Sequence, residues 1–520
     1  MRKPQLPFLL ALAMLLGLQP LVAQQRYLDQ VFTSVSRTDG IVYGNNISVL
    51  TQGPQDLVME VYRPENDSAT DRPLVILATT GNFLPPILNG SPTGSYKDST
   101  VVELAIRLAK HGYVVASIFY RQGWDALNPS QEIQTATLLQ AAYRGIQDAR
   151  TAIRFFRKDV AENGNTYGID PDRIVVGGVG TGGYVSLGSA YFDDYEKVKL
   201  PKFTDFTTGL PYVDTTVHGN IYATNTATLS LPNHVGYSSD FNMVFNIGGA
   251  LGDTSWLDPG DMPYVGFHTP QDPFAPYDIG VVIVPTTGNT VIDQAAGSYG
   301  VAKIVNTFGN NDLFVDAGFS DVFTQRANVL NDGYEGLFAF DRPFTPGDYT
   351  CSNGATQPLV PEGSPWSWWN EAVFIATWDA ATGGNPFPGV IANCRELRGN
   401  PDMSPEKGRR YVDSIESYLA PRMYLALDLS TTSIENDLLR HYLSVYPNPA
   451  QSVLFVKNDQ ADRPIQGLRL LDLAGRTVYT AEGLAGNLHS IPCGDLSPGM
   501  YLLQVRTAVA QTQVRVLIQR

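Results

Sequence analysis

Between residues 57 and 257, short apolar runs rich in β-branched residues alternate with longer stretches in which apolar residues recur every three or four positions. The short runs predict strands and the longer stretches predict helices. The predicted strands are 57–62, 74–78, 113–120, 174–176, 241–247 and 264–267. The predicted helices are 101–110, which Gly112 ends, and 138–158, whose core-facing stripe contains Ile146, Ala149, Ile153 and Phe156. This alternation predicts an α/β domain with a mostly parallel sheet and helices on both faces.

Two stretches interrupt the alternation. Residues 199–239 are rich in Thr, Asn and Pro and predict an insertion over the C-terminal edge of the sheet, where lids lie. Residues 309–399 predict a second, irregular insertion. It carries four of the six tryptophans, namely Trp366, Trp368, Trp369 and Trp378. A helix is predicted after it at 404–419, with Ser404 as N-cap and Glu406 in the first turn.

The pattern changes again after residue 429. A polar stretch leads into short strands at 468–472, 476–479, 500–506 and 513–518, with turns between them. This pattern predicts a small all-β sandwich that is separate from the α/β domain. We therefore expect a signal peptide at 1–23, the α/β domain at 24–430, a linker at 431–442 and the sandwich at 443–520.

The N-terminus has the features of a secretory signal peptide. Arg2 and Lys3 form a positive region, and the apolar run 8–18 has eleven residues, too few to span a bilayer. Residues 21–23 read LVA and suit cleavage after Ala23. The alternative is a buried N-terminal helix, but the flanking residues favour export.

Composition narrows the classes of function. The 520-residue chain is 43% hydrophobic and 11% aromatic, which is enough for a sizeable core, and its formal net charge is −15. An acidic surface disfavours nucleic acid and anionic membranes as partners. With three cysteines, no C-x-x-C pair and six histidines, we expect neither a metal site nor a cofactor.

Export also bears on the cysteines. Cys351 and Cys394 share the second insertion, so we expect them to form a disulfide in an oxidising compartment. Cys493 lies far along the chain and is expected to stay unpaired.

The segment 174–186, IVVGGVGTGGYVS, has the pattern of a G-x-S-x-G nucleophile elbow, in which a tight strand-to-helix turn presents a serine hydroxyl above the sheet. Gly178 and Gly182 match the flanking glycines. The serine position is Gly180, which has no side chain and cannot attack a carbonyl.

Several stretches resemble the carboxylesterase branch of the α/β-hydrolases. They are PLVILATTGNF, HGYVVASIFYR, GIQDARTAIRFFRKD, YGIDPDRIVVGG and GYSSDFNMVFNIGGALGDTSWLDPGDMPYVGFHTPQD. The resemblance covers about residues 57–429 and implies an α/β-hydrolase fold.

The C-terminal segment resembles the type IX secretion sorting domain of Bacteroidetes-type bacteria. The matching stretches are VYPNPA, LLDLAGRTV and LSPGMYLLQV. The resemblance implies handling by the type IX secretion machinery, then release or anchoring at the outer cell surface.

The carboxylesterase resemblance also assigns the acid and the base. Asp272 matches the triad acid, with a turn-capping aspartate as the alternative. His268 matches the histidine of the family's H-G-x-x-D stretch, which is usually structural. The base should follow the acid, but the next histidine is His441, in the linker. His218 and His234, in the first insertion, are the possible bases or else exposed lid residues.

The oxyanion region is also altered. Thr181 would supply its backbone N–H, and its side chain should point away from the nucleophile position. The loop that reads HGGG in the family is here Thr79, Thr80, Gly81 and Asn82, so one glycine of three remains. A β-carbon at Thr80 or Asn82 restricts the close backbone approach that glycine allows.

Joint loss of nucleophile, base and oxyanion loop favours a secreted, non-catalytic pseudoenzyme with a binding cleft. Its ligand would be a small ester, a lipid or a carbohydrate. Trp366, Trp368 and Trp369 are the candidate ligand contacts, because aromatic faces stack on sugars and apolar groups. The alternative is that these tryptophans pack the insertion onto the domain.

Two other functions stay open. One is an active carboxylic-ester hydrolase of unusual mechanism, with His218 or His234 as base and Thr181 or a nearby serine as nucleophile. The other is a structural cell-surface protein without a ligand.

Overall fold

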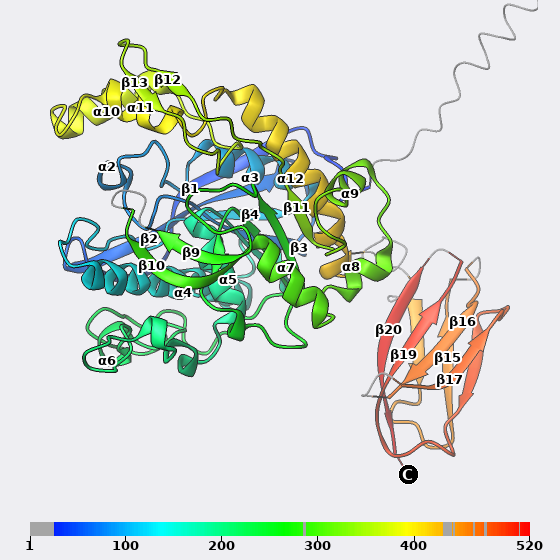
Figure 1. Cartoon of the computed structure of the whole chain (residues 1–520). Coiled ribbons are helices and arrows are strands. Elements are labelled where there is room, and N and C mark those ends of the chain that lie inside the picture. Colours follow the sequence, from blue (N-terminus) through cyan, green and yellow to red (C-terminus); the bar gives the residue numbers. More distant parts are fainter. Residues whose placement is uncertain are drawn as a thin grey trace, which may run out of the picture. The chain divides into compact units, whose positions relative to one another are not determined.

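A computed structural model describes residues 25–283, 288–429, 439, 442–460, 463–472, 476–508 and 510–519. The chain divides into two compact units, 1–427 and 428–520 (Figure 1). The predicted signal peptide and most of the predicted linker lie outside the described residues. In the part that is described, no helix has both the length and the apolar character needed to cross a bilayer.

Unit 1 is built on a sheet of eight strands in the order β1-β2-β4-β3-β5-β6-β8-β11. The strands are β1 (Val35–Ser48), β2 (Gly53–Pro64), β3 (Arg72–Ala78), β4 (Val114–Ile118), β5 (Ile169–Val179), β6 (Met243–Ile247), β8 (Tyr264–His268) and β11 (Leu337–Ala339). Strands β1, β2 and β4 pair antiparallel, and every pair from β4 to β11 is parallel. The predicted mostly parallel α/β sheet is confirmed, and each predicted strand is present in it.

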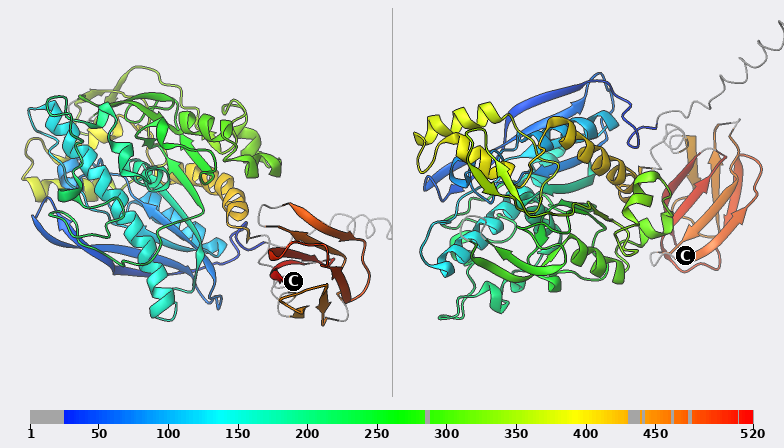
Figure 2. Two further views of the ribbon diagram at one scale, coloured as in Figure 1. Left: turned by 90° about the horizontal axis from the view of Figure 1, so that it is seen from below. Right: turned by 45° about the horizontal axis from the view of Figure 1, so that its top comes forward.

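Helices cover both faces of this sheet (Figure 2). They are α3 (Ser99–His111), α4 (Gln131–Glu162), α5 (Thr181–Tyr191), α7 (Ser298–Thr307) and α12 (Pro405–Ala426). Alternate residues of β3 show the two layers. Leu74 and Ile76 belong to the core cluster that holds Ile153 of α4, whereas Val75 and Leu77, which are also buried, point to the opposite face. Gly112 ends α3 in a left-handed conformation, as predicted.

A second sheet, β7-β10-β9, was not predicted from the sequence. Its strands are β7 (Ala250–Leu251), β9 (Ile279–Ile283) and β10 (Thr290–Gly297), and all pair antiparallel. Short connecting helices complete this part of the chain: α2 (Pro86–Asn89), η1 (Tyr195–Val198), η2 (Pro201–Phe203), α6 (Thr215–His218) and η3 (Thr254–Trp256).

The first insertion, 199–239, packs along α4. Side chains of α4 donate to its backbone carbonyls: Gln147 to His218 and Asn220, Arg150 to Ile221, and Arg154 to Asn233. Because a segment with little regular structure must find partners for its buried carbonyls, this row of donors determines where the insertion packs.

The second insertion is less irregular than predicted. It contains α8 (Asp312–Ala317), α9 (Val322–Ala327), β12 (Asp348–Thr350), β13 (Thr356–Pro358), α10 (Glu371–Thr382) and α11 (Gly389–Leu397), and strand β11 adds to the main sheet. These elements are short and separated by Gly and Pro, which explains why no periodic pattern is visible in the sequence. We call residues 341–400, which follow β11, the cap segment.

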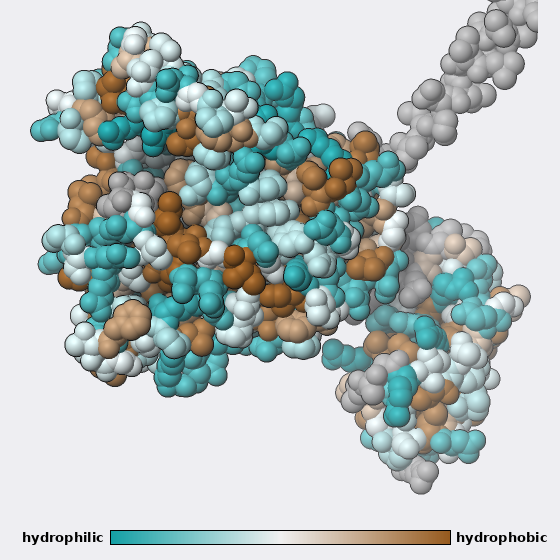
Figure 3. All heavy atoms as spheres, viewed as in Figure 1, coloured by the Kyte–Doolittle hydropathy of each residue, from teal (hydrophilic) through white to brown (hydrophobic). Residues whose placement is uncertain are grey.

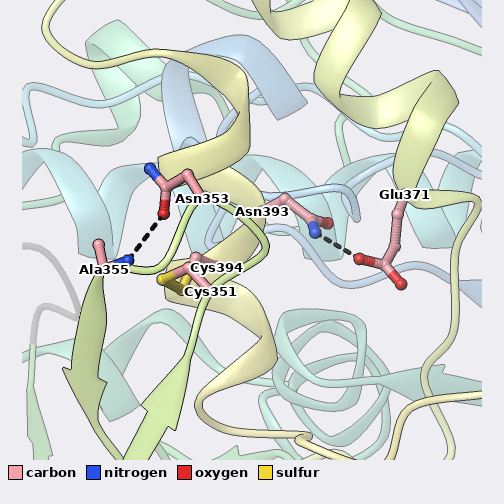
Figure 4. Close-up of a disulfide and its surroundings, with 6 residues drawn as sticks. All are labelled: Cys351, Asn353, Ala355, Glu371, Asn393 and Cys394. Carbon is pink, nitrogen blue, oxygen red and sulfur yellow. Dashed lines mark hydrogen bonds between the residues drawn. A yellow bond between two sulfur atoms is a disulfide. The ribbon is translucent and has the colours of Figure 1, made fainter.

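The predicted disulfide between Cys351 and Cys394 is present, with 5.5 Å between the Cα atoms (Figure 4). It joins the β12–β13 hairpin to α11. Asn353 accepts from the backbone of Ala355, and Asn393 donates to Glu371 on α10. Cys493 is free, as predicted, and it is buried.

Replacing both Cys351 and Cys394 by serine is expected to lower the free energy of unfolding of unit 1 by about 2–4 kcal/mol, because the bridge restricts a long loop in the unfolded chain. Urea unfolding of the wild type and the double variant measures the difference. Dithiothreitol should shift the wild-type midpoint and leave the double variant unchanged. An equal shift in both proteins would contradict the prediction.

Unit 2 is the predicted all-β sandwich. One sheet has the order β14-β15-β18 and the other β17-β16-β19-β20. The strands are β14 (Leu443–Tyr446), β15 (Val453–Asn458), β16 (Gly467–Leu471), β17 (Thr477–Glu482), β18 (Leu488–Pro492), β19 (Gly499–Arg506) and β20 (Gln511–Ile518). Leu454, Leu470, Leu503 and Val516 share one buried cluster, so the two sheets enclose a common core.

Candidate functional site

The elbow keeps its backbone geometry without its nucleophile. Gly180 lies between β5 and α5 with φ 54° and ψ −118°, a conformation that residues with a β-carbon rarely adopt. The flanking glycines are required by close backbone approach: a β-carbon at Gly178 would lie 1.9 Å from the Gly182 carbonyl oxygen, and one at Gly182 would lie 2.1 Å from that of Ala78. The chain therefore forms the sharp strand-to-helix turn of a nucleophile elbow.

The side chain of Thr80 occupies the space above Gly180. A β-carbon at position 180 would lie 2.1 Å from Oγ1 and 2.9 Å from Cβ of Thr80. Contacts this short do not occur between real side chains, so a serine at 180 and the observed Thr80 conformation exclude one another. The sequence identifies both positions separately, but nothing in it indicates that they touch, since they lie in different loops.

The residues of the oxyanion region form hydrogen bonds with neighbouring side chains. Tyr120 donates to the carbonyl of Thr79 at 2.8 Å, and its hydroxyl lies 3.2 Å from that of Thr181. The Thr181 side chain therefore faces Tyr120, as expected for a residue beside an elbow. Asn82 has φ 52° and donates to Asn89, and its carbonyl accepts from Trp124. Gly81, with φ 117°, approaches the backbone of Gly94 too closely for any β-carbon.

Asp272 lies in the loop after β8, at the position that the resemblance assigns to the acid. Its Oδ1 accepts from the backbone N–H groups of Phe274 and Ala275, so it also caps a turn. Its Oδ2 lies 3.5 Å from Nε2 of His268. His268 is fully buried, and its Nδ1 lies 2.9 Å from Oγ of Ser298.

The two possible bases lie elsewhere. Nδ1 of His218 lies 3.0 Å from the carbonyl oxygen of Asp214, and burial lowers its pKa to about 4. Nε2 of His234 lies 2.8 Å from the Tyr43 carbonyl oxygen, and burial lowers its pKa as well. Neither ring is hydrogen-bonded to a hydroxyl near Gly180, so the structure does not bring these histidines together with the elbow.

Trp366 fills the space beside Asp272. It is fully buried, and a β-carbon at Gly248 would lie 2.9 Å from its Cζ2 atom and 3.8 Å from Oδ2 of Asp272. Thr100 donates to the Trp366 carbonyl at 2.9 Å, and the ring of Phe340 lies 5.9 Å away.

The other two tryptophans also pack inward. Trp368 is 9% exposed and lies against Gly408 of α12, and the half-buried Trp369 donates to Asn393. Aromatic side chains therefore pack the cap segment against the rest of unit 1. Apolar residues are visible on the face that carries α2, β9 and α10 (Figure 3), and the exposed apolar side chains of these elements include Leu88, Val281 and Val373.

The cap segment also contacts the loop after α2 through a carboxyl group. Glu396 of α11 accepts from Oγ of Ser91 at 2.9 Å, and burial raises its pKa to about 7. In the unfolded chain a glutamate has a pKa of ~4.3, whereas in the folded protein Glu396 stays protonated up to a higher pH. The free energy of unfolding therefore falls as the pH rises above ~4.3, and this loss is complete above about pH 7.

Glu396→Gln is therefore expected to stabilise unit 1, and the gain should grow by about 1–2 kcal/mol between about pH 5.5 and about pH 8.5. The glutamine amide keeps an acceptor for Ser91 and removes the charge. Urea unfolding at the two pH values measures the gain against the wild type. A gain that does not change with pH would count against a neutral Glu396 in the folded protein.

In the part of the chain that is described, no group of three or more His, Cys, Asp or Glu residues could hold a metal ion. The residues of the site offer hydroxyl, amide and carboxylate groups, and the described hydrogen bonds join the ring nitrogens of His218, His234 and His268 to groups other than Thr80 or Thr181. As it stands, the arrangement can form hydrogen bonds to a ligand at the half-buried Thr80, Gly180 and Thr181.

Two family models match parts of the chain. Residues 59–218 match the BD-FAE family, an esterase-like α/β-hydrolase family, and residues 444–519 match the secretion system C-terminal sorting domain. No curated protein matches the chain. The similar solved structures include Thermogutta terrifontis esterase 2 phosphorylated by paraoxon, at 19% identity over 47% of this chain and 74% of that chain, with a TM-score of 0.29.

Another similar structure is the butyrate-bound form of a thermophilic esterase from the same organism, at 15% identity over 58% of this chain and 83% of that chain, with a TM-score of 0.31. The family matches and the sheet topology together identify unit 1 as an esterase-like α/β-hydrolase fold. The sorting domain indicates secretion to the cell surface or the exterior and implies handling by the type IX secretion machinery.

Proposed function

We propose that this secreted, esterase-like protein is a pseudoenzyme, without serine-hydrolase activity. The observation that carries the proposal is the contact between Gly180 and Thr80. The serine position has no side chain, and a hydroxyl from another loop lies 2.1 Å from where the serine β-carbon would be. A serine there would require the Thr80 side chain to move.

The environment of Asp272 supports the same conclusion. A triad needs an imidazole that takes the proton of the nucleophile and is oriented by the acid. Among the described residues, the imidazole near Asp272 is His268, which is fully buried and lies against Ser298. Without the serine–histidine pair, a triad enzyme retains only the catalysis that oxyanion stabilisation and binding provide.

We further propose that any ligand binds beside Gly180, at the turn between β5 and α5, or on the surrounding surface. Thr80 and Thr181 present hydroxyl groups in a half-buried setting, whereas the space beside Asp272 is filled by Trp366. A small ester, a lipid or a carbohydrate remains the proposed class of ligand. A purely structural role at the cell surface needs no ligand and stays the simpler alternative.

One observation favours a second function, an ester hydrolase that uses Thr80 as nucleophile. Its hydroxyl is half-buried and lies close to the place that a serine side chain would take. This mechanism would need a base, and the hydrogen bonds of His218, His234 and His268 lead elsewhere. For that reason we rank it second.

A panel of p-nitrophenyl esters, together with a fluorophosphonate probe, separates the two functions. The pseudoenzyme should show no turnover above the buffer blank and no covalent adduct. An adduct that maps to Thr80 by peptide mass spectrometry and disappears in Thr80→Val would establish the second function. The matched control is Thr181→Val, which removes the neighbouring hydroxyl and should leave either result unchanged.

A further inference from the structure

We infer that the free edge of β18 in unit 2 binds an extended strand of a partner polypeptide, and that the type IX secretion machinery supplies this strand. The inference goes beyond the proposed function, because it concerns unit 2 and does not depend on whether unit 1 is catalytic. In the described part of unit 2, β18 is the last strand of one sheet and β17 is the last strand of the other.

The ladder between β15 and β18 shows which backbone groups of β18 face outward. At its two ends, the N–H of Cys493 donates to the Ser452 carbonyl, and the N–H of Asn458 donates to the Asn487 carbonyl. In an antiparallel ladder only every second residue bonds to the neighbouring strand. The odd-numbered residues from 487 to 493 therefore face β15, and the even-numbered residues between them turn their backbone groups to the free edge.

Strand β18 lacks the charges that usually protect an edge strand from pairing. Strand β17 contains Glu482 and β20 contains Arg515, whereas β18 reads LHSIP and has no Asp, Glu, Lys or Arg. Pro492 has no N–H and ends the row of outward donors. Leu488 and Ser490 thus offer N–H donors and carbonyl acceptors to a further strand, and the Leu488 side chain is 54% exposed.

A groove lies beside this edge. Its volume is about 380 Å³, and its lining comes from both sheets: Phe455 and Leu488 from one, Leu468 and Tyr479 from the other, with Leu484 in the turn between β17 and β18. Side chains of a strand alternate between the two faces of its sheet, so every second side chain of an added strand would point into this groove. Because these five lining side chains are apolar or aromatic, the strand that fits has apolar residues at alternate positions.

The opposite side of the same sandwich shows what covers an open edge. There the segment between β14 and β15 lies along the edge of β20, where Ala450 donates to the Leu517 carbonyl and accepts from the Gln519 N–H. Asn448 accepts from the Leu517 N–H and donates to the Arg515 carbonyl. Ala450 is fully buried in the core of the unit. An extended segment with a small apolar residue therefore closes that side, and an extended segment is the occupant that we assign to the β18 edge.

The identity of unit 2 indicates the source of the strand. Unit 2 is a sorting domain, which implies handling by the type IX secretion machinery, and handling requires contact with the domain. Strand addition provides that contact through main-chain hydrogen bonds, and the side chains that enter the groove add specificity. A second copy is disfavoured as the occupant, because two chains with a net charge of −15 repel one another.

The first test measures strand addition to the secreted protein. The probe is a fluorescein-labelled peptide of threonine–valine repeats with a lysine at each end, and fluorescence anisotropy measures its binding. Leu488→Lys adds a charge at the edge, and Ser490→Pro removes an outward N–H without affecting the β15 ladder, so each should weaken binding at least about tenfold. The matched control, Val478→Lys, adds the same charge to the edge strand β17 and should bind the peptide as the wild type does.

A second peptide, N-methylated at every internal residue, has the same charge and side chains but no internal N–H donors, so it should not bind. Equal binding of the two peptides, no binding of the first peptide to the wild type, or binding that Val478→Lys alone weakens would overturn the inference. Sedimentation velocity without peptide should show a monomer. A dimer that Leu488→Lys dissociates would overturn the inference, since a second copy would then occupy the edge.

The second test follows export from a bacterium that has the type IX secretion machinery. Leu488→Lys and Ser490→Pro should lower the amount of protein outside the cell at least about tenfold relative to the wild type, whereas Val478→Lys should be released normally. Limited proteolysis of the retained protein checks that unit 2 has folded. Normal release of both edge variants would overturn the assignment of the strand to the secretion machinery, as would equal retention of Val478→Lys.

Discussion

Replacing Gly180 by serine is expected to leave p-nitrophenyl acetate turnover at the level of the buffer blank and to lower the free energy of unfolding of unit 1 by about 1–3 kcal/mol. The serine β-carbon would lie 2.1 Å from Oγ1 of Thr80, so one of the two side chains must move. The backbone at φ 54° adds strain for any residue with a β-carbon. Turnover stays absent because a serine hydroxyl is a weak nucleophile until a base takes its proton.

The companion variant Gly180→Ser/Thr80→Gly separates the steric part from the chemical part. Removing the Thr80 side chain should restore most of the lost stability, and the activity should remain absent. Chemical denaturation and a p-nitrophenyl acetate assay of the wild type, both single variants and the double variant measure the two effects. Turnover typical of esterases in Gly180→Ser would show that a base reaches the elbow, and His218 and His234 would be the first residues to replace.

Replacing Trp366 by alanine is expected to lower the free energy of unfolding of unit 1 by about 3–5 kcal/mol, the usual cost of truncating a buried aromatic side chain. The indole is fully buried between Gly248 and Phe340, so its removal leaves a cavity beside Asp272. Urea unfolding followed by far-UV circular dichroism measures the loss without relying on tryptophan fluorescence.

Trp369→Ala is the matched control for this prediction. Trp369 lies on the same segment but is half-buried, and its indole donates to Asn393. Its truncation should cost clearly less than that of Trp366. Equal losses would contradict the conclusion that Trp366 is the residue that fills the space beside Asp272.

The sequence was sufficient to predict the parts of the fold that depend on local patterns. Apolar runs and stripes predict strands β2 to β6 and β8 and helices α3, α4 and α12, and Ser404 does cap α12 by accepting from Lys407. The pairing of Cys351 with Cys394 follows from export and from their shared segment. The elbow is also local, because its glycines are required by contacts within a single turn.

What the sequence could not predict depends on contacts between distant segments. The pair Thr80 and Gly180 is 100 positions apart, and neither residue alone indicates the other. Strand β11 has three residues and belongs to the sheet only because it pairs with β8. The first insertion follows α4 because Arg150 and Arg154 donate to its carbonyls, an arrangement that no periodic pattern encodes.

The bridge between Cys351 and Cys394 has a consequence for the order of maturation. Disulfides form and persist in oxidising compartments, so the disulfide of the cap segment forms only after the chain has left the cytoplasm. Protein produced in a reducing cytosol would have the same fold, but its cap segment would lack the disulfide. Recombinant protein for ligand screens should therefore be exported to an oxidising compartment. Its free thiols should be counted before use. The mature form should have one free thiol, the buried Cys493.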